Sequence, residues 1–131
     1  MSATQRILVA DDDVLVRMVA NETLTRAGYE VVLAEGGNEA IASLEGQRFD
    51  LVITDIIMPD VDGLELTREV RRRWPLTPII AISSGGRLDS GFYLPMANAL
   101  GATAVMAKPL RPGPFLLAVQ DVLDRAQRRI A

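Results

Sequence analysis

The sequence predicts one α/β domain built on a five-stranded parallel sheet with helices on both faces. Five short apolar runs, rich in β-branched residues, alternate along the chain with longer amphipathic stretches. Strands joined through helices run parallel, because each right-handed crossover needs a helix to return the chain. No linker or repeat interrupts the alternation, and 131 residues suit a single domain. We therefore expect residues 1–131 to fold as one unit.

The expected strands are short runs of β-branched and other apolar residues. The central run, Leu-Val-Ile-Thr, has no alternation of polar and apolar positions, which is typical of a strand buried on both faces. The turn residues Pro59 and Gly63 follow it and stop regular structure. In chain order the strands are residues 7–10, 31–34, 51–54, 79–82 and 103–107.

The expected helices lie between and after the strands and carry apolar side chains at helical spacing. Glycine ends the first, second and fourth helices at positions 28, 46 and 101, and Pro75 stops the third. We expect the fourth to start late or to be short, because Pro95 would interrupt a helix begun earlier. In chain order the helices are residues 14–27, 37–45, 64–73, 95–100 and 112–129.

Composition excludes several classes of function. The chain contains no cysteine and no histidine, which rules out disulfide scaffolds, thiolate metal sites and mechanisms with a Ser-His or Cys-His pair. The net charge is −3 and no basic run exceeds residues 71–73, so nucleic-acid binding has little electrostatic support. No apolar stretch reaches the roughly 18 residues of a membrane span. We therefore expect a cytoplasmic protein that binds neither nucleic acid nor membrane.

Polar residues of chemical interest follow four of the expected strands. Ligands of such sheets bind beyond the carboxyl ends of the strands, so these residues would share one edge. Acids crowded there repel one another unless a hard cation such as Mg²⁺ neutralises them, and a lysine and a hydroxyl would donate to a phosphoryl group. The set predicts a phosphoryl-transfer site with a carboxylate nucleophile. Its members are Asp11, Asp12 and Asp13 after the first strand, Asp55 after the third, Ser83 and Ser84 after the fourth, and Lys108 after the fifth.

Each of these residues also has an ordinary structural interpretation. Asp13 is well placed to cap the first helix, and Asp60 and Asp62 to form the turn and cap before the third. Ser83 by itself would start a loop, and Lys108 by itself would be a solvated lysine. Their joint occurrence at four strand ends of one parallel sheet favours the site.

Four motifs stand in order along the chain: ILVADDD at 7–13, DLVITDIIMPDVDG at 50–63, PIIAIS at 78–83 and GATAVMAKP at 101–109. Together they resemble the receiver domain of two-component response regulators, over essentially the full length. The resemblance implies a doubly wound, flavodoxin-like fold with strand order 2-1-3-4-5. It further implies a single-domain, chemotaxis-regulator-like protein of phosphorelay signal transduction, with no output domain in this chain.

The resemblance also implies roles for the acids. Asp55 resembles the phosphoacceptor, which attacks the phosphohistidine of a sensor histidine kinase or histidine phosphotransfer protein. Asp11 and Asp12 resemble the acids that hold Mg²⁺, together with Asp55 and the backbone carbonyl of Ile57. The domain would be a signalling phosphoacceptor rather than an enzyme, since it would catalyse only its own phosphorylation and dephosphorylation. Phosphorylation would switch its binding to a downstream protein target.

The remaining roles concern the switch. Ser83 matches the hydroxyl that turns toward the phosphoryl group, and Lys108 matches the lysine that pairs with it. The family usually has a switching aromatic residue three positions before this lysine, where this chain has Val105. Valine has one strongly preferred rotamer, so we expect the switch to work through residues 84–91, ordered by phosphorylation. A passively floppy loop is an equally good interpretation of that glycine-rich segment.

A surface of the first helix is a hypothetical docking site. Helical spacing leaves Leu15 and Met18 outside the apolar stripe and beside the acids. We expect both side chains to be exposed and to help dock the helical hairpin of the kinase or phosphotransfer partner. The stripe that faces the core comprises Val16, Val19, Ala20, Thr23, Leu24 and Ala27.

Two alternatives to the receiver remain open. A small haloacid-dehalogenase-type phosphatase would use Asp11 as its nucleophile and Asp13 as its acid, but it needs a further acid pair after the lysine. Asp121 and Asp124 are three apart within an expected helix and fit that need poorly. A pseudo-receiver that signals only by binding proteins is disfavoured by the complete set of acids.

Overall fold

The sheet has the predicted architecture. The computed structural model describes residues 4–58, 60–83, 95, 99 and 101–130. Its strands pair in parallel in the order β2-β1-β3-β4-β5, which confirms the doubly wound topology implied by the resemblance. The strands are β1 (Arg6–Ala10), β2 (Glu30–Ala34), β3 (Leu51–Asp55), β4 (Ile79–Ser83) and β5 (Ala104–Ala107).

Four helices of the described chain follow the expected boundaries closely. They are α1 (Val14–Arg26), α2 (Gly37–Gly46), α3 (Gly63–Arg73) and α5 (Pro112–Ile130). The expected short helix at 95–100 and the expected switch segment 84–91 lie outside the described residues, apart from positions 95 and 99. α1 ends before Gly28, which has a positive φ of 99°, as expected of a closing glycine.

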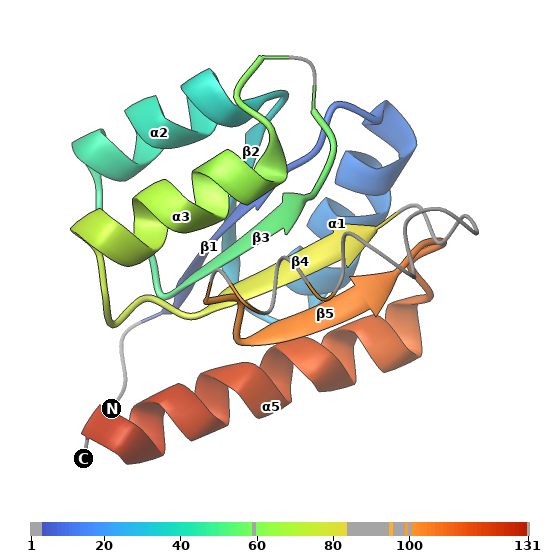
Figure 1. Cartoon of the computed structure of the whole chain (residues 1–131). Helices are drawn as coiled ribbons and strands as arrows, with labels where there is room; N and C mark the ends of the chain where they lie inside the picture. Colours follow the sequence, from blue (N-terminus) through green and yellow to red (C-terminus); the bar gives the residue numbers. More distant parts are fainter. Residues whose placement is uncertain (1–3, 59, 84–94, 96–98, 100, 131) are drawn as a thin grey trace.

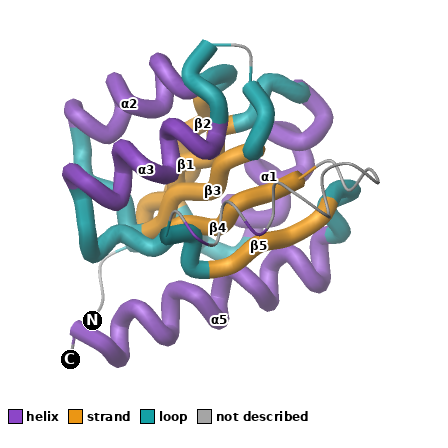
Figure 2. Tube along the Cα trace, in the orientation of Figure 1, coloured by secondary structure: helices purple, strands orange, loops and turns teal. Residues whose placement is uncertain are grey.

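The helices form two layers, one on each face of the sheet (Figures 1 and 2). Alternation along a strand sends successive side chains to opposite faces. Ile7 and Val9 of β1 pack with α1 and α5, whereas Leu8 and Ala10 pack with α2 and α3. Both faces are therefore apolar, and the central strands β1, β3 and β4 are buried along almost their whole length.

Helix ends are fixed by aspartates, in one case differently from expectation. Asp13 caps α1 by accepting a hydrogen bond from the Leu15 N–H, and Asp62 caps α3 in the same manner. Asp60 lies in the bend before α3, as expected, but it does not cap that helix. Its carboxylate instead accepts hydrogen bonds from the backbone at the amino end of α2, far away in sequence.

Candidate functional site

Four strand ends converge at one edge of the sheet (Figure 1). Asp11 follows β1 directly, Asp55 is the last residue of β3, Ser83 is the last residue of β4, and Lys108 follows β5. Because these strands are neighbours and run parallel, their carboxyl ends bring the four residues to the same place. The structure thus assembles the residues that the sequence singled out.

Lys108 reaches across the edge to two carboxylates. Its Nζ lies 3.1 Å from Asp11 Oδ2 and 3.3 Å from Asp55 Oδ2, and its side chain is only 15% exposed. Burial acts to lower the pKa of Lys108, but the two carboxylates outweigh it and raise the pKa, so the amine stays charged. This geometry contradicts the ordinary interpretation of a solvated lysine. The Lys108–Pro109 peptide bond is cis.

The acids are more numerous than this one cation can neutralise. Asp11 is fully buried and Asp55 nearly so, while Asp12 is exposed. Burial, followed by repulsion from Asp11, raises the pKa of Asp55 to about 6, although Lys108 acts in the opposite direction. Burial likewise raises the pKa of Asp11, even though its Oδ1 accepts a 2.8 Å hydrogen bond from the Asp13 N–H. The edge therefore has surplus negative charge at neutral pH.

The donor set suits a hard divalent cation. Asp11, Asp12 and Asp55 each offer a carboxylate oxygen, and these oxygens lie within 4.8 Å of one another. Asp11 Oδ2 is buried, and although Lys108 Nζ lies 3.1 Å away, it accepts no hydrogen bond of good geometry from the described residues. A buried oxygen without a hydrogen bond is costly, and a cation coordinated by oxygen atoms would satisfy it. The three residues can therefore hold such a metal ion.

The other predicted site residues occupy the same edge at different depths. Ser83 is buried, and its carbonyl accepts a 2.7 Å hydrogen bond from the Lys108 N–H. Ile57 lies two residues beyond Asp55, with its side chain half exposed. Val105 lies on the edge strand β5, pairs with Ala81 of β4 and is 38% exposed. Its role in a switch stays a prediction.

The exposed part of α1 is as predicted, with one addition and one correction. Leu15 and Met18 are 66% and 60% exposed, and the sequence reasoning missed Val14, which is 55% exposed beside them. Ala27 was assigned to the core stripe, but it is exposed because the helix has already ended there. The remaining stripe residues are buried or half-buried.

Sequence reasoning also missed an arginine that supports the acids. Arg17, on α1, donates a 2.8 Å hydrogen bond from Nη1 to the backbone carbonyl of Asp11. This bond and the hydrogen bond from the Asp13 N–H hold the turn between β1 and α1 from two sides. No pattern in the sequence marks such a contact, because a long arginine side chain has many rotamers and many possible partners.

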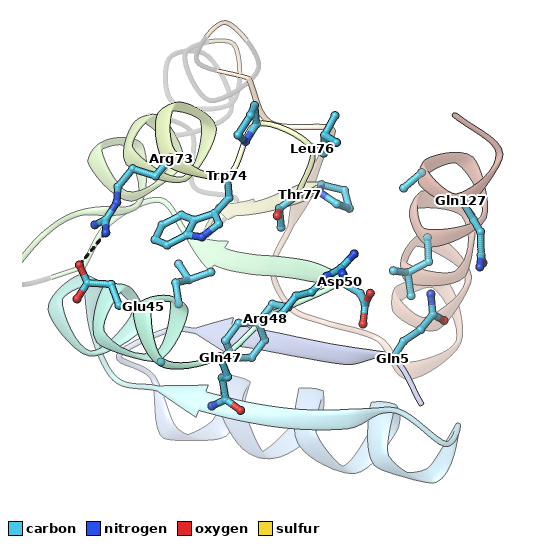
Figure 3. Close-up of a pocket in the computed structure, with 17 residues that line it drawn as sticks. Gln5, Glu45, Gln47, Arg48, Asp50, Arg73, Trp74, Leu76, Thr77 and Gln127 are labelled. Atoms are coloured by element: carbon cyan, nitrogen blue, oxygen red, sulfur yellow. Dashed lines mark ion pairs between the residues drawn. The ribbon is translucent and has the colours of Figure 1, made fainter. Parts of the chain in front are cut away.

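A hollow in the described surface lies elsewhere. It has a volume of about 760 Å³ and is lined by Gln5, Asp50 and Pro78, which precede β1, β3 and β4. Figure 3 shows Trp74 beside it, together with Arg73, which forms a 2.9 Å ion pair with Glu45. This hollow is therefore at the amino ends of the strands, whereas Asp11 and Asp55 lie at their carboxyl ends.

The phosphatase alternative gains no support from the geometry. Asp13 caps α1 instead of standing free as an acid, and Asp121 forms an ion pair with Arg125 on the surface of α5.

Among the described residues, no helix has both the length and the apolar character needed to cross a bilayer.

Comparisons with known proteins agree on one family. The family model described as the response regulator receiver domain matches residues 7–120. The alkaline phosphatase synthesis transcriptional regulatory protein PhoP of Bacillus subtilis is 30% identical over 94% of this chain and 50% of its own length. The DNA-binding transcriptional regulator NtrC of Salmonella typhimurium is 34% identical over 94% of this chain and 26% of its own length. The chain thus spans half or less of these curated relatives.

Solved structures of similar length share the whole fold. Chemotaxis protein CheY4 of Vibrio cholerae has a TM-score of 0.82 and 34% identity, over 92% of this chain and 99% of that one. A CheY-like receiver domain protein from Methanospirillum hungatei has a TM-score of 0.88 and 28% identity, over 97% of this chain and 99% of that one. With this fold, this convergence of acids and lysine, and a family match over most of its length, the chain belongs to the receiver domains of two-component response regulators.

Proposed function

We propose that Asp55 accepts a phosphoryl group from the phosphohistidine of a sensor histidine kinase or histidine phosphotransfer protein. The observation that carries this proposal is the position of Asp55, a nearly buried carboxylate at a strand end with Lys108 Nζ 3.3 Å away and two further acids beside it. A pKa of about 6 leaves this carboxylate mostly ionised at neutral pH, as a nucleophile must be.

The transfer exchanges one bond to phosphorus for another. An oxygen of Asp55 forms the new P–O bond while the P–N bond to the histidine breaks, and the imidazole leaves with the electron pair and takes up a proton. Asp11, Asp12, Asp55 and the Ile57 carbonyl would hold Mg²⁺, which would supply positive charge beside the acids and the phosphoryl oxygens. Attack by water on the acyl phosphate then releases inorganic phosphate and restores Asp55.

Lys108 and Ser83 would donate hydrogen bonds to the negatively charged phosphoryl oxygens. Phosphorylation adds a dianionic group to a site that already has surplus negative charge, so cationic and hydroxyl donors are needed close by. The amine of Lys108 lies within ion-pair distance of Asp55, and Ser83 ends the adjacent strand. Ser83 and Val105 would act in the switch, which would change binding to a downstream protein target.

The partner surface would include the exposed start of α1. Leu15 and Met18 lie one turn apart near Asp12 and Asp13, where an incoming phosphohistidine must approach. We assign them to docking of the kinase or phosphotransfer protein. We expect phosphotransfer to take place in the cytoplasm, without direct contact of this domain with nucleic acid or membrane.

The test is to locate the phosphoryl group. The protein is incubated with Mg²⁺ and acetyl phosphate, and the modified residue is mapped by mass spectrometry. A label on Asp55 that disappears in Asp55→Asn but persists in the matched variant Asp62→Asn, from the same loop, is the expected result. A label on Asp11 would favour the phosphatase alternative. No label, together with no response to beryllofluoride by NMR, would favour a pseudo-receiver.

A further inference from the structure

The amino end of α2 lacks a cap within its own sequence segment. The first turn of a helix leaves backbone N–H groups without helical partners, and a side chain before the helix normally accepts one of them. The residue in that position is Gly36, which has no side chain to do so. Asp60 supplies the cap instead, with Oδ1 2.9 Å from the Gly37 N and Oδ2 3.1 Å from the Asn38 N.

The two glycines allow the second segment to approach this closely. A Cβ on Gly36 would lie 2.6 Å from Asp60 Oδ1, and a Cβ on Gly37 would lie 2.2 Å from the Val61 carbonyl oxygen. Real Cβ atoms do not make such contacts, so a side chain on Gly36 would displace the Asp60 carboxylate, and one on Gly37 would push the backbone of the segment away. The backbone around Asp60 and Val61 therefore packs directly on the end of α2.

The segment that is held in this way connects β3 to α3 and begins at the proposed phosphoacceptor. Its first residues are Ile56 and Ile57, the latter proposed to offer its carbonyl to Mg²⁺. Its far end returns to its start, since the Gly63 N–H donates a 2.6 Å hydrogen bond to the Ile56 carbonyl. A Cβ on Gly63 would lie 1.7 Å from the Asp55 carbonyl oxygen. The described ends of the segment are thus held close together, and Asp60 ties it to another element.

We propose that Asp60 is a positioning residue of the phosphoacceptor site: it ties the β3–α3 loop to the amino end of α2 and so fixes the backbone that presents Ile57. The inference rests on the proposed function, because it concerns the cation site named there. Asp60 would act through the loop and not as a ligand, because its carboxylate is engaged at the amino end of α2. Groups that orient a metal ligand contribute strongly to metal affinity even though they do not bind the metal.

A helix cap with no role at the site would also explain these hydrogen bonds, and the chain offers a control that separates the two. Glu39 lies in the first turn of α2, and its carboxylate accepts a 2.8 Å hydrogen bond from the Glu35 N–H. It therefore stabilises the same helix end with the same charge. Its hydrogen bond joins α2 only to the turn that directly precedes it, whereas those of Asp60 join α2 to the β3–α3 loop.

The experiment compares wild type, Asp60→Ala, Asp60→Asn and Glu39→Ala by calorimetric titration with Mg²⁺. We expect Asp60→Ala to weaken Mg²⁺ binding about tenfold, the lower end of what removal of an orienting group costs. Asp60→Asn removes the negative charge, as Asp60→Ala does, but keeps one oxygen acceptor. Its Mg²⁺ affinity should therefore lie between those of Asp60→Ala and wild type. Glu39→Ala should remain within about twofold of wild type, because it leaves the loop tied.

Phosphorylation kinetics supply a second readout. With acetyl phosphate as donor, the Mg²⁺ concentration for half-maximal labelling should rise in Asp60→Ala, while the rate at saturating Mg²⁺ stays near that of wild type. Equal Mg²⁺ affinity in Asp60→Ala and wild type, or an equal loss in Glu39→Ala, would overturn the positioning role and leave the proposed function intact. A wild type that binds no Mg²⁺ would overturn both.

Discussion

Replacing Asp55 by asparagine should stabilise the protein at about pH 8 when divalent cations are removed. The native fold raises the pKa of this carboxyl from 3.8 to about 6, mainly by burial and by repulsion from Asp11. The native state therefore holds the proton more tightly than the unfolded chain, so stability falls as pH rises from about 4 through 6. At about 1.4 kcal/mol for each pH unit, the ionised carboxylate costs the native state about 3 kcal/mol above that range.

The asparagine variant avoids this cost because an amide does not ionise. The raised pKa already includes the attraction of Lys108, so losing that ion pair does not reverse the sign. We expect Asp55→Asn to be more stable than wild type by about 1 to 3 kcal/mol at about pH 8, and by much less near pH 4. Added Mg²⁺ should stabilise wild type more than Asp55→Asn and so reduce the difference in stability between them.

Urea unfolding in buffer that contains a chelator measures the free energies of unfolding of wild type and variant, with circular dichroism and the fluorescence of Trp74 as probes. Asp124→Asn, on the exposed surface of α5, is the control for removing one negative charge and should stay within about 0.5 kcal/mol of wild type at each pH. The reasoning is refuted if Asp55→Asn is less stable than wild type at about pH 8. A stability difference that does not change with pH would refute it equally.

The remaining predictions concern the loop after β3 and the surface of α1. Gly63→Ala should destabilise the protein by more than about 3 kcal/mol, because its Cβ would lie 1.7 Å from the Asp55 carbonyl oxygen, and urea unfolding measures this. The double variant Leu15→Ala with Met18→Ala should slow phosphotransfer from the cognate kinase but not labelling by acetyl phosphate. Leu76→Ala, 79% exposed in the α3–β4 connection, is its control; unchanged phosphotransfer in the double variant would remove the docking assignment.

Much of the fold follows from local patterns that the chain repeats. Uninterrupted apolar runs such as 51–54 identify strands buried on both faces, and a parallel order places their carboxyl ends together. That is why Asp55 and Lys108 could be paired from sequence although they are far apart in the chain. The strand order itself does not follow from periodicity, because any order with right-handed crossovers satisfies the same pattern. It required the family resemblance.

The parts that sequence reasoning missed are contacts between loops. We expected the Asp60 side chain to bond to backbone close to it in sequence, since an aspartate in a turn before a helix normally does so. Its actual partners, Gly37 and Asn38, lie 23 and 22 positions earlier, and only the packing of α2 beside α3 brings them within reach. The pair Gly36 and Gly37 was a usable signal, because adjacent glycines at the start of a helix suggest close approach of another backbone.

Central and edge strands differ in how easily they can move in response to a change of charge at the acids. Ser83 ends β4, which is buried along its full length and packed on both sides, so movement of that strand would disrupt the core. Lys108 follows β5, an edge strand whose side chains are half-buried or exposed, and this strand is bound to the sheet on one side only. A shift of Lys108 toward new negative charge on Asp55 would therefore be taken up by β5. Val105 is 38% exposed on this strand and its β-branched side chain has restricted rotation, so it would move with β5 in such a shift.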